Sequence, residues 1–302
     1  MAIGVFDGVH LGHQQVIRQT LADARQHEGV PVVITFDRHP NAVVAPDRVP
    51  PMLYSLPQKL RAIASLGVAN TLLIRFDRAF SEQTGEQFIR GLARDFGHLH
   101  SVCVGSEFTF GYKRSGNVAL LKQLGAELKF TVHGLATLAL DGEPVRSTRI
   151  REAVRAGDLD AASQMLGREY AIAGTVVRGD QLGRQLGFPT ANLDVSGLIL
   201  PPNGVYAVHA RVAGREHRGA LNLGFRPTLA SPTPRLQCEV HLLDFAEDIY
   251  GAELELNFVA RLRDEQKFPD VEALQAQIIR DLAAARSLTW QTPCAASVRR
   301  SQ

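Results

Sequence analysis

The sequence predicts two domains of different fold class: an α/β domain with helices on both faces of a parallel sheet, then a mostly β domain closed by one helix. Two observations indicate this division. Up to about Phe130, apolar runs alternate with amphipathic helical stretches, which is typical of a covered parallel sheet. From Tyr170 to about Leu262, short alternating strands are separated by glycine and proline turns, which favours an antiparallel barrel or sandwich. The chain has 302 residues, enough for two separate cores.

The first half contains five expected strands and four expected helices. The strands are short apolar runs at Ala2–Phe6, Val30–Phe36, Thr71–Phe76, Ser101–Gly105 and Leu128–Val132. The helices have amphipathic periodicity and lie at Gln14–His27, Ser55–Leu66, Thr84–Phe96 and Val118–Leu124. Thr84 and Gln87 are spaced as a capping box, and Gly67 and Gly125 stand where helices are expected to end.

The second half has a different organisation. Two short helices, Arg149–Ala156 and Leu159–Met165, are expected to connect the halves. We therefore predict a first domain at residues 1–150, a helical linker at 151–169, a second domain at 170–290 and a disordered tail at 291–302. The strands of the second domain are expected at Ile172–Val177, Val205–Val212, Arg218–Leu223, Gln237–Leu243 and Leu254–Val259. The helix Val271–Ala285 would close this domain with its apolar residues Leu274, Ile278, Ile279 and Leu282.

Composition and charge exclude several classes of protein. The chain has 33 basic and 31 acidic residues, a net charge of +2, and no basic stripe with interleaved aromatic residues that would indicate nucleic-acid binding. Cys103, Cys238 and Cys294 are far apart and form no C-x-x-C pair, which is typical of a reducing compartment. No apolar stretch reaches the ~18 residues of a membrane span, and the N-terminus has no signal-like core. We expect a cytoplasmic protein with no membrane or nucleic-acid partner, and leave its oligomeric state open.

The turn after the first strand carries the strongest functional signal. His10 and His13 flank Gly12 in an H-x-G-H pattern between a buried strand and a helix. A helix N-terminus has unpaired N–H groups and the positive end of the helix dipole, and Gly12 lets a phosphate approach the backbone closely. His10 and His13 can then donate to phosphate oxygens as charge builds up on them. Nucleotidyl transfer needs this arrangement, because it relies on positioning and electrostatics.

Other interpretations of this turn are weaker. A lone histidine near a helix start is more often a solvated cap, but two histidines that flank a glycine after a buried strand favour a phosphate site. The turn matches neither G-x-x-x-x-G-K-[ST] nor G-x-G-x-x-G. A zinc site would need further ligands that no cysteine cluster supplies.

A second phosphate signal lies in the β half. The glycine-rich loop 179–187 contains Arg184, and its Gly183 and Gly187 would let backbone N–H groups face an anion. It runs directly into a Pro-Thr-Ala-Asn segment, whose Thr190 and Asn192 share one face of an extended chain. Their neutral oxygens suit a Mg²⁺ whose charge is already balanced by ATP phosphates. A hairpin loop with a capped turn is the plainer interpretation, but it does not account for the whole combination.

Two further side chains are candidates for this second site. Glu239 lies on an alternating strand and shares its face with Gln237 and His241, whereas Cys238, Val240 and Leu242 take the core side. Such a carboxylate is usually a surface residue, but beside a phosphate cleft it could accept a proton from an attacking hydroxyl. Arg263 could stack on a planar heterocycle, with a solvated charged segment as the alternative.

Taken together, these motifs resemble the prokaryotic bifunctional riboflavin kinase/FMN adenylyltransferase family, also called FAD synthetase. The resemblance extends from Ile3 to about Leu288 and follows the order of the family's motifs. The most specific string is Leu186-Gly187-Phe188-Pro189-Thr190-Ala191-Asn192. Further matching segments are Phe6–His13, Val104-Gly105, Phe108–Gly111, Ser147–Arg151, Gly204–Tyr206, Asn222–Thr228, Glu239–Phe245 and Asp248–Gly251.

The resemblance implies two ATP-dependent reactions. The domain at 170–290, a Greek-key β-barrel in the family, would phosphorylate riboflavin to FMN, with Mg²⁺–ATP held at Thr190 and Asn192 and Glu239 as general base. The domain at 1–150, of the nucleotidyltransferase type, would adenylylate FMN to FAD and release pyrophosphate, with His10 and His13 at the transferred phosphoryl group. The remaining implied site residues are Gly4, Phe6, Gly12, Ser147, Thr148, Arg151, Gly183, Arg184 and Gly187 for ATP, and Glu107, Phe108 and Arg263 for flavin.

Departures from the family pattern are confined to the first domain. The family usually has asparagine at Val5, aspartate or asparagine at Glu107, and Pro-His-Pro where this chain has Arg38-His39-Pro40. Its usual Arg-(Ile/Val)-Ser-Ser-(Ser/Thr) is here Pro144 to Thr148, with proline in place of the arginine and Arg146 in place of the first serine. Proline carries no charge and donates no hydrogen bond. A riboflavin kinase with a catalytically weakened adenylyltransferase domain is therefore the alternative hypothesis.

Overall fold

The computed structural model describes residues 1–179, 181–226 and 235–288, and divides the chain into two compact units. The first unit comprises Met1–Ala173 and Val195–Pro202, and the second comprises Gly174–Asp194 and the chain from Asn203 onward. The tail expected at 291–302, Asp180 of the glycine-rich loop and the Pro227-Thr228 pair of the motif strings lie outside the described residues. Among the described residues, no helix combines the length and apolar character needed to cross a bilayer.

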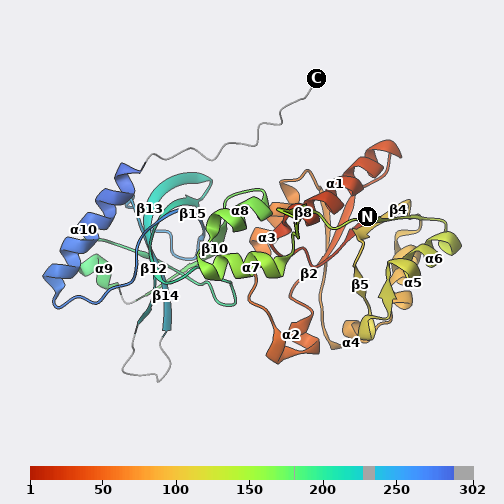
Figure 1. Ribbon diagram of the computed structural model, residues 1–302, viewed down its shortest axis with the longest axis horizontal. Coiled ribbons are helices and arrows are strands. Elements are labelled where there is room, and N and C mark those ends of the chain that lie inside the picture. Colours follow the sequence, from red (N-terminus) through yellow and green to blue (C-terminus); the bar gives the residue numbers. More distant parts are fainter. Residues whose placement is uncertain (180, 227–234, 289–302) are drawn as a thin grey trace. The chain divides into compact units, whose positions relative to one another are not determined.

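The first unit is built on a five-stranded parallel sheet of order β3-β2-β1-β4-β7. Figure 1 labels β2 and β4 of this sheet and the helices α1, α3, α5 and α6 of the same unit. Its strands are β1 Ala2–Ile3, β2 Val32–Phe36, β3 Asn70–Ile74, β4 Ser101–Gly105 and β7 Thr131–Leu135. The helices are α1 Leu11–Gln26, α2 Asn41–Val44, α3 Leu56–Ala64, α4 Arg78–Ser81, α5 Gly85–Phe96, α6 Val118–Leu128, α7 Ser147–Ala156 and α8 Leu159–Leu166. Two small hairpins are added by β5 Thr109–Phe110 with β6 Gly116–Asn117, and by β8 Ala139–Leu140 with β9 Glu143–Pro144.

Separate apolar clusters cover the two faces of this sheet, as the α/β prediction requires. Adjacent strand residues point to opposite faces: Ile3 and Ile34 belong to the cluster that includes α5 and α6, whereas Ala2 and Val33 belong to the cluster that includes α1 and α3. The capping box at the start of α5 is confirmed, because the Thr84 side chain accepts from Gln87 N and the Gln87 side chain accepts from Thr84 N.

Several predicted boundaries in the first half are wrong. Gly125 does not end its helix: α6 continues to Leu128, with Lys129 left-handed at φ 63°, so the strand expected at Leu128–Val132 begins only at Thr131. A Cβ on Gly125 would lie 2.6 Å from the Phe130 carbonyl oxygen, so this glycine permits a close approach of backbone rather than a turn. Likewise β1 ends at Ile3, because Phe6 adopts a left-handed conformation at φ 51°.

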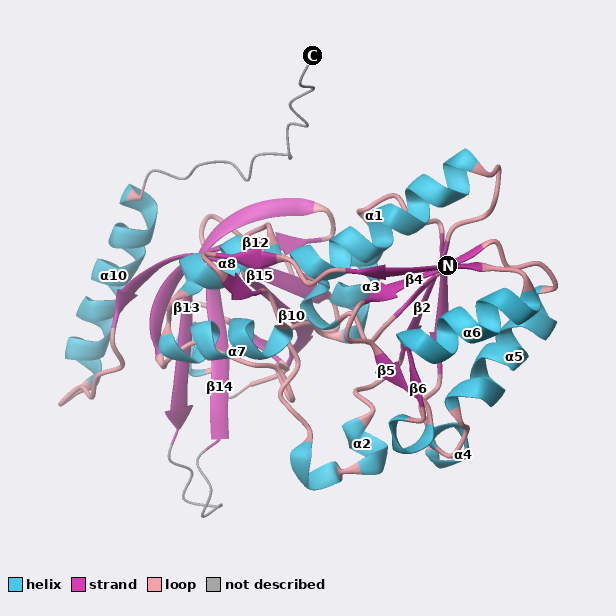
Figure 2. Cartoon of the chain, turned by 45° about the vertical axis from the view of Figure 1, so that its right-hand side comes forward, coloured by secondary structure: helices cyan, strands magenta, loops and turns pink. Residues whose placement is uncertain are grey.

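The second half forms a closed antiparallel barrel of order β10-β11-β14-β13-β12-β15, rather than a sandwich (Figure 2). All of it belongs to the second unit except the first three residues of β10. Its strands are β10 Ala171–Val177, β11 Ala191–Leu193, β12 Gly204–Val212, β13 Arg215–Arg226, β14 Arg235–Leu242 and β15 Glu253–Arg263. The helices are α9 Leu182–Gln185, in a loop where none was expected, and α10 Val271–Ser287.

Helix α10 closes the barrel as predicted and packs on β12, β13 and β15. Ala285 of α10 is fully buried against Ala207 and Ala220 of the barrel. One residue of the expected apolar face differs: Ile279 is 57% exposed, because it lies beside the buried stripe instead of within it.

Two candidate functional sites

The first site forms where α1 begins, directly after β1. His10 is the N-cap of α1, and its ring Nδ1 accepts a hydrogen bond from His13 N at 3.4 Å. The rings of His10 and His13 stack with centroids 3.6 Å apart, and Phe6 packs edge-on against His13. A Cβ on Gly12 would lie only 3.3 Å from the His10 ring, so a larger residue would crowd the stack. The two imidazoles are therefore held together at a helix N-terminus.

Burial keeps both imidazoles neutral. Burial, together with the positive charges of Arg168 and Arg151, lowers the pKa of His10 from 6.5 to about 4. The pKa of His13 falls well below its usual value, first through burial and then through His10, Lys59 and Arg168. His13 Nδ1 is buried and has no hydrogen-bond partner among the described residues. Neutral rings near several cations can each donate one N–H to an anion.

Two of these cations were missed by sequence reasoning. Lys59 of α3 is 3% exposed, and its Nζ donates to Val5 O, Thr35 Oγ1 and Phe36 O at 3.3, 3.2 and 2.8 Å. Because all three acceptors are neutral, burial dominates and lowers the pKa of Lys59 to about 8. The available signal was its helical spacing of four from the buried Ile63, which places a lysine on an apolar face.

Arg168 is the second missed cation, and it binds the backbone of the turn that precedes the histidines. Its guanidinium donates to Gly8 O at 2.6 Å and to Val9 O at 3.2 Å, and its Nε donates to Tyr54 Oη at 2.8 Å. Arg168 and Gly8 are 160 residues apart in the sequence, so only the folded chain brings them into contact. Arg168 therefore fixes the backbone that presents His10.

Asp7 and Arg151 form a buried ion pair behind the same turn. Arg151 donates to Asp7 Oδ2 at 2.5 Å and to Pro51 O at 2.7 Å, and Asp7 also accepts from Leu53 N at 3.0 Å. Burial raises the pKa of Asp7, and the Arg151 charge opposes that rise. Arg151 is thus occupied in positioning the turn, and the expected contact with ATP stays a prediction.

The start of α7 lies against this turn. Ser147 Oγ donates to Asp7 O at 3.1 Å, and the next residue, Thr148, is exposed in the first turn of the helix. The side chain of the N-cap residue, Arg146, makes no capping hydrogen bond to the first turn of α7. Gly4 contributes only backbone, and its N–H donates to Ile34 O at 3.1 Å.

The departures from the family pattern at 107 and 146 meet in the structure. Arg146 Nη2 and Glu107 Oε2 form an ion pair of 2.8 Å, with the side chains 54% and 65% exposed. The neighbouring Phe108 stacks on Phe110, with ring centroids 5.2 Å apart. Two unusual residues therefore compensate each other's charge at the surface.

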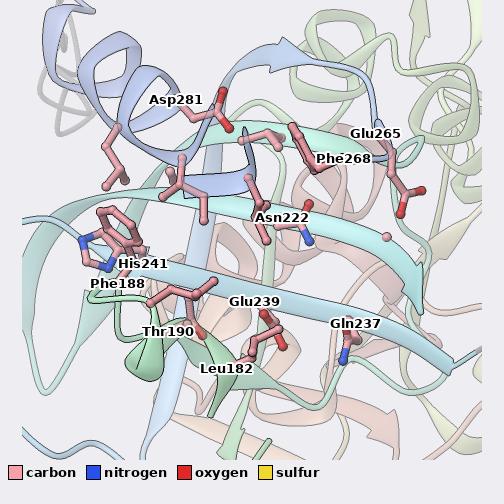
Figure 3. Close-up of a pocket in the computed structure, with 18 of the residues that line it drawn as sticks. Leu182, Phe188, Thr190, Asn222, Gln237, Glu239, His241, Glu265, Phe268 and Asp281 are labelled. Carbon is pink, nitrogen blue, oxygen red and sulfur yellow. The ribbon is translucent and has the colours of Figure 1, made fainter. Parts of the chain in front are cut away.

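The second site is an open cavity of about 800 Å³ on the barrel, lined from α9, β13, β14, β15 and α10 (Figure 3). Glu239 of β14 is half-buried on this wall, between Gln237 and His241 on the same face. In the strand register Asn192 of β11 and Asn222 of β13 both lie opposite Glu239. Three polar side chains, one on each of three adjacent strands, therefore form a row across the sheet. The sequence could not indicate this row, because it depends on which strands pair and in what register.

The glycine-rich loop folds over one end of this row. A Cβ on Gly183 would lie 2.5 Å from Phe188 O and 3.1 Å from Thr190 Oγ1, so no larger residue fits there without a shift. Gly187 has φ +88°, which favours glycine. Thr190 lines both the large cavity and a smaller one of about 350 Å³, and the exposed Arg184 lines the smaller one.

His241 is another residue that sequence reasoning assigned only to a strand face. Its Nδ1 lies 2.8 Å from Pro189 O, and because a carbonyl can only accept, this nitrogen carries the proton. His241 thus holds the segment that presents Thr190, and it lines the cavity as well. In Figure 3, His241 lies next to Phe188, and Thr190 and Glu239 follow along the same wall of the cavity.

Arg263 also lines the large cavity, at the end formed by α10. It pairs with Asp281 at 2.8 Å, and its guanidinium lies 5.8 Å from the ring centre of Phe268. Asp281 is 7% exposed and was not predicted as a site residue, because its partner lies on a different element.

A helix N-terminus with two imidazoles, and a barrel cavity with a carboxylate between two amide side chains, are together typical of a nucleotide-dependent transferase. Family models agree: the FAD synthetase model matches residues 1–149, and the riboflavin kinase model matches residues 166–289. The chain belongs to the family of bifunctional riboflavin kinase/FMN adenylyltransferases.

Individual relatives match over nearly the whole chain. The bifunctional riboflavin kinase/FMN adenylyltransferase of Escherichia coli K12 is 38% identical over 287 residues, covering 95% of this chain and 91% of the relative. The protein of the same name from Listeria monocytogenes is 39% identical over 284 residues, covering 93% and 89%. A crystal structure described as a macrolide-efflux protein from Streptococcus pneumoniae superposes with a TM-score of 0.79 at 28% identity, covering 95% of this chain and 94% of that one.

Proposed function

We propose that the chain makes FAD from riboflavin in two steps, phosphorylation at the barrel and adenylylation at the α/β unit. The observation that carries this proposal is the presence of two separately built polar sites, each matched by its own family model. In domain terms, we assign adenylyltransferase activity to residues 1–150 and kinase activity to residues 170–290, joined by helices at 151–169.

In the kinase step, the terminal hydroxyl of the ribityl chain attacks the γ-phosphorus of ATP. A new O–P bond forms, the bond to the β-phosphate oxygen breaks, and ADP leaves. Glu239 takes the hydroxyl proton, because it lies half-buried on the cavity wall beside Thr190. The large cavity would hold the flavin and the smaller one, which Arg184 lines, the nucleotide; Thr190 lines both, so transfer would occur beside it.

The oxygens of Thr190 and Asn192 fit a hard divalent cation such as Mg²⁺. Both side chains are half-buried, and Asn192 lies opposite Glu239 in the register. Hydroxyl and amide oxygens are neutral ligands, so ATP phosphates would complete and balance such a site. When bound, the cation would neutralise charge on the phosphates. The backbone N–H of Gly183 would point to the same phosphates, whereas Gly187, whose N–H donates to Arg184 O at 3.2 Å, would shape the loop around them.

In the adenylyl transfer, a phosphate oxygen of FMN attacks the α-phosphorus of ATP, and pyrophosphate leaves. His10 and His13 donate hydrogen bonds to the phosphoryl oxygens, whose charge rises in the transition state. The nearby cations Lys59 and Arg168 are held by neutral acceptors, so their positive field is available to an anion. Gly4, Phe6 and Gly12 would contact ATP through backbone, and Ser147 and Thr148 from the start of α7.

The remaining assignments concern flavin and compartment. Glu107 and Phe108 would contact FMN at the first site, and Arg263 would contact riboflavin at the second. We assign the chain to the cytoplasm, because Cys103 and Cys238 are buried free thiols, as is usual for proteins of a reducing compartment.

The pairing of Arg146 with Glu107 favours one alternative, a kinase whose adenylyltransferase domain is weakened. Product analysis separates the two. Riboflavin, ATP and Mg²⁺ are incubated with the chain, and flavins are resolved by chromatography over time. The proposal expects FMN to appear and then FAD. Accumulation of FMN alone supports the alternative, and unchanged riboflavin contradicts both.

A further inference from the structure

The contacts of Arg263 restrict what this residue can offer to a ligand. Its Nε lies 3.0 Å from both oxygens of Asp281, its Nη2 lies 2.8 Å from Asp281 Oδ2, and its Nη1 donates to Asp264 O at 2.9 Å. All three guanidinium nitrogens therefore have an acceptor in or near the guanidinium plane. These bonds use three of its five N–H groups, which leaves the flat face and the two remaining N–H groups for the cavity.

Asp281 is itself held rigidly. It is 7% exposed, and besides Arg263 it accepts from Gln277 Nε2 at 2.8 Å, one turn earlier on α10. The bidentate pair fixes both the position and the tilt of the guanidinium, since two nitrogens of a planar fork meet one carboxylate. Phe268, with its ring centre 5.8 Å from the guanidinium carbon, adds a second flat group at this end of the cavity.

We propose that Asp281 is a positioning residue, which locks the plane of Arg263 as a stacking surface for the isoalloxazine ring of riboflavin. This inference rests on the proposed kinase function and specifies how its cavity recognises the flavin. Asp281 also compensates the Arg263 charge, so this end of the cavity suits an uncharged aromatic ring better than a phosphate. Phosphates are then directed toward the Thr190 end, where Arg184 lines the smaller cavity.

The test measures riboflavin affinity of the full-length chain by quenching of flavin fluorescence, with Mg²⁺ and ADP present. Kinase kinetics are measured on the same proteins. Asp281→Asn should raise the Kd and KM for riboflavin about tenfold, with kcat within about threefold and KM for ATP unchanged, because the reacting end is untouched. Glu272→Gln removes the same charge from an exposed position of α10 and should change none of these values. An unchanged riboflavin Kd in folded Asp281→Asn protein would overturn the inference.

A double-mutant cycle separates positioning from general support of the fold. In an Arg263→Ala background, Asp281→Asn should cause no further loss of riboflavin affinity, because Asp281 acts through Arg263. Additive losses would show a structural role and contradict the proposal.

A second variant keeps the test decisive if Asp281→Asn does not fold. Arg263→Lys retains the positive charge and a partner for Asp281 but loses the planar fork, so it should bind riboflavin as weakly as Arg263→Ala. Wild-type affinity in Arg263→Lys would overturn the stacking role. A wild-type chain that makes no FMN would instead overturn the kinase function, and this inference with it.

Discussion

The two sites use their charged residues in opposite ways. At the H-x-G-H turn the charged side chains point inward: Lys59, Arg168 and the Asp7–Arg151 pair bind backbone and each other. At the barrel, Glu239 lines an open cavity of about 800 Å³. The first site is thus a buried framework that aims backbone N–H groups and neutral imidazoles, whereas the second presents reactive side chains directly.

This difference explains which substitutions should be selective. A framework site loses activity when its geometry shifts, so substitutions at many surrounding residues should each lower the activity slightly. A site that acts through one side chain loses activity when that group is removed, so substitution of this one residue should have the largest effect.

Glu239→Gln should have the largest and most selective effect. The amide keeps the shape but cannot take the hydroxyl proton, so riboflavin phosphorylation should fall by about 10²–10⁴-fold. FMN adenylylation, assayed separately with FMN as substrate, should survive. Glu216→Gln, an exposed glutamate of β13, is the matched control. A normal kinase rate in the Glu239 variant would remove this residue as the base.

His13→Ala should produce the reverse pattern. Loss of one preorganised donor at the phosphoryl group should lower FMN adenylylation by about 10²–10³-fold, while riboflavin phosphorylation persists. His27→Ala, at the exposed far end of the same helix α1, should leave both rates unchanged. Near wild-type FAD formation by His13→Ala would mean that the turn does not act on phosphate.

The buried His10 predicts acid sensitivity of the first unit. With a pKa of about 4 in the fold and 6.5 when unfolded, His10 takes up a proton on unfolding between these values. Its contribution to stability is therefore complete above pH 6.5 and is lost as pH falls toward 4, by up to about 3 kcal/mol. His10→Asn keeps the helix cap but does not titrate, so its unfolding free energy should change less with pH. Urea unfolding at pH 7 and pH 4.5 checks this, and parallel profiles for the two proteins would contradict it.

Local patterns predicted the fold class and the longer strands and helices, because these have a clear periodicity, but they missed short elements such as β11 and α9. The sequence also indicated Glu239, Thr190 and the two histidines, since spacing along one strand or turn places them together. It placed Lys59 on an apolar helix face without indicating its partners, and it could not indicate that Arg168 binds Gly8 or that Asp281 is the partner of Arg263. Those contacts join distant elements, and only the folded chain brings them together.

Boundaries failed where a glycine serves close packing. Gly125 was interpreted as a helix end, yet its missing Cβ makes room for the Phe130 carbonyl while the helix runs on. Local sequence cannot distinguish a glycine needed for φ from one needed for space. The same ambiguity applies to Gly12, whose role depends on the His10 ring above it.

The Arg146–Glu107 pair gives the smallest expected effect and the sharpest test of the alternative hypothesis. Both side chains are more than half exposed, so the pair should contribute under about 1 kcal/mol to stability. Arg146→Ala should therefore leave thermal unfolding nearly unchanged. If Arg146 supplies the charge that Pro144 cannot, the variant should lower FMN adenylylation about threefold to tenfold, with the loss shrinking at high salt as an exposed charge requires. The matched control is Arg90→Ala, which breaks an exposed pair with Glu127 on the same unit. Equal adenylylation rates in the wild type and Arg146→Ala, across salt concentrations, would show that Arg146 does not replace the missing charge, and would leave the first site dependent on its buried framework alone.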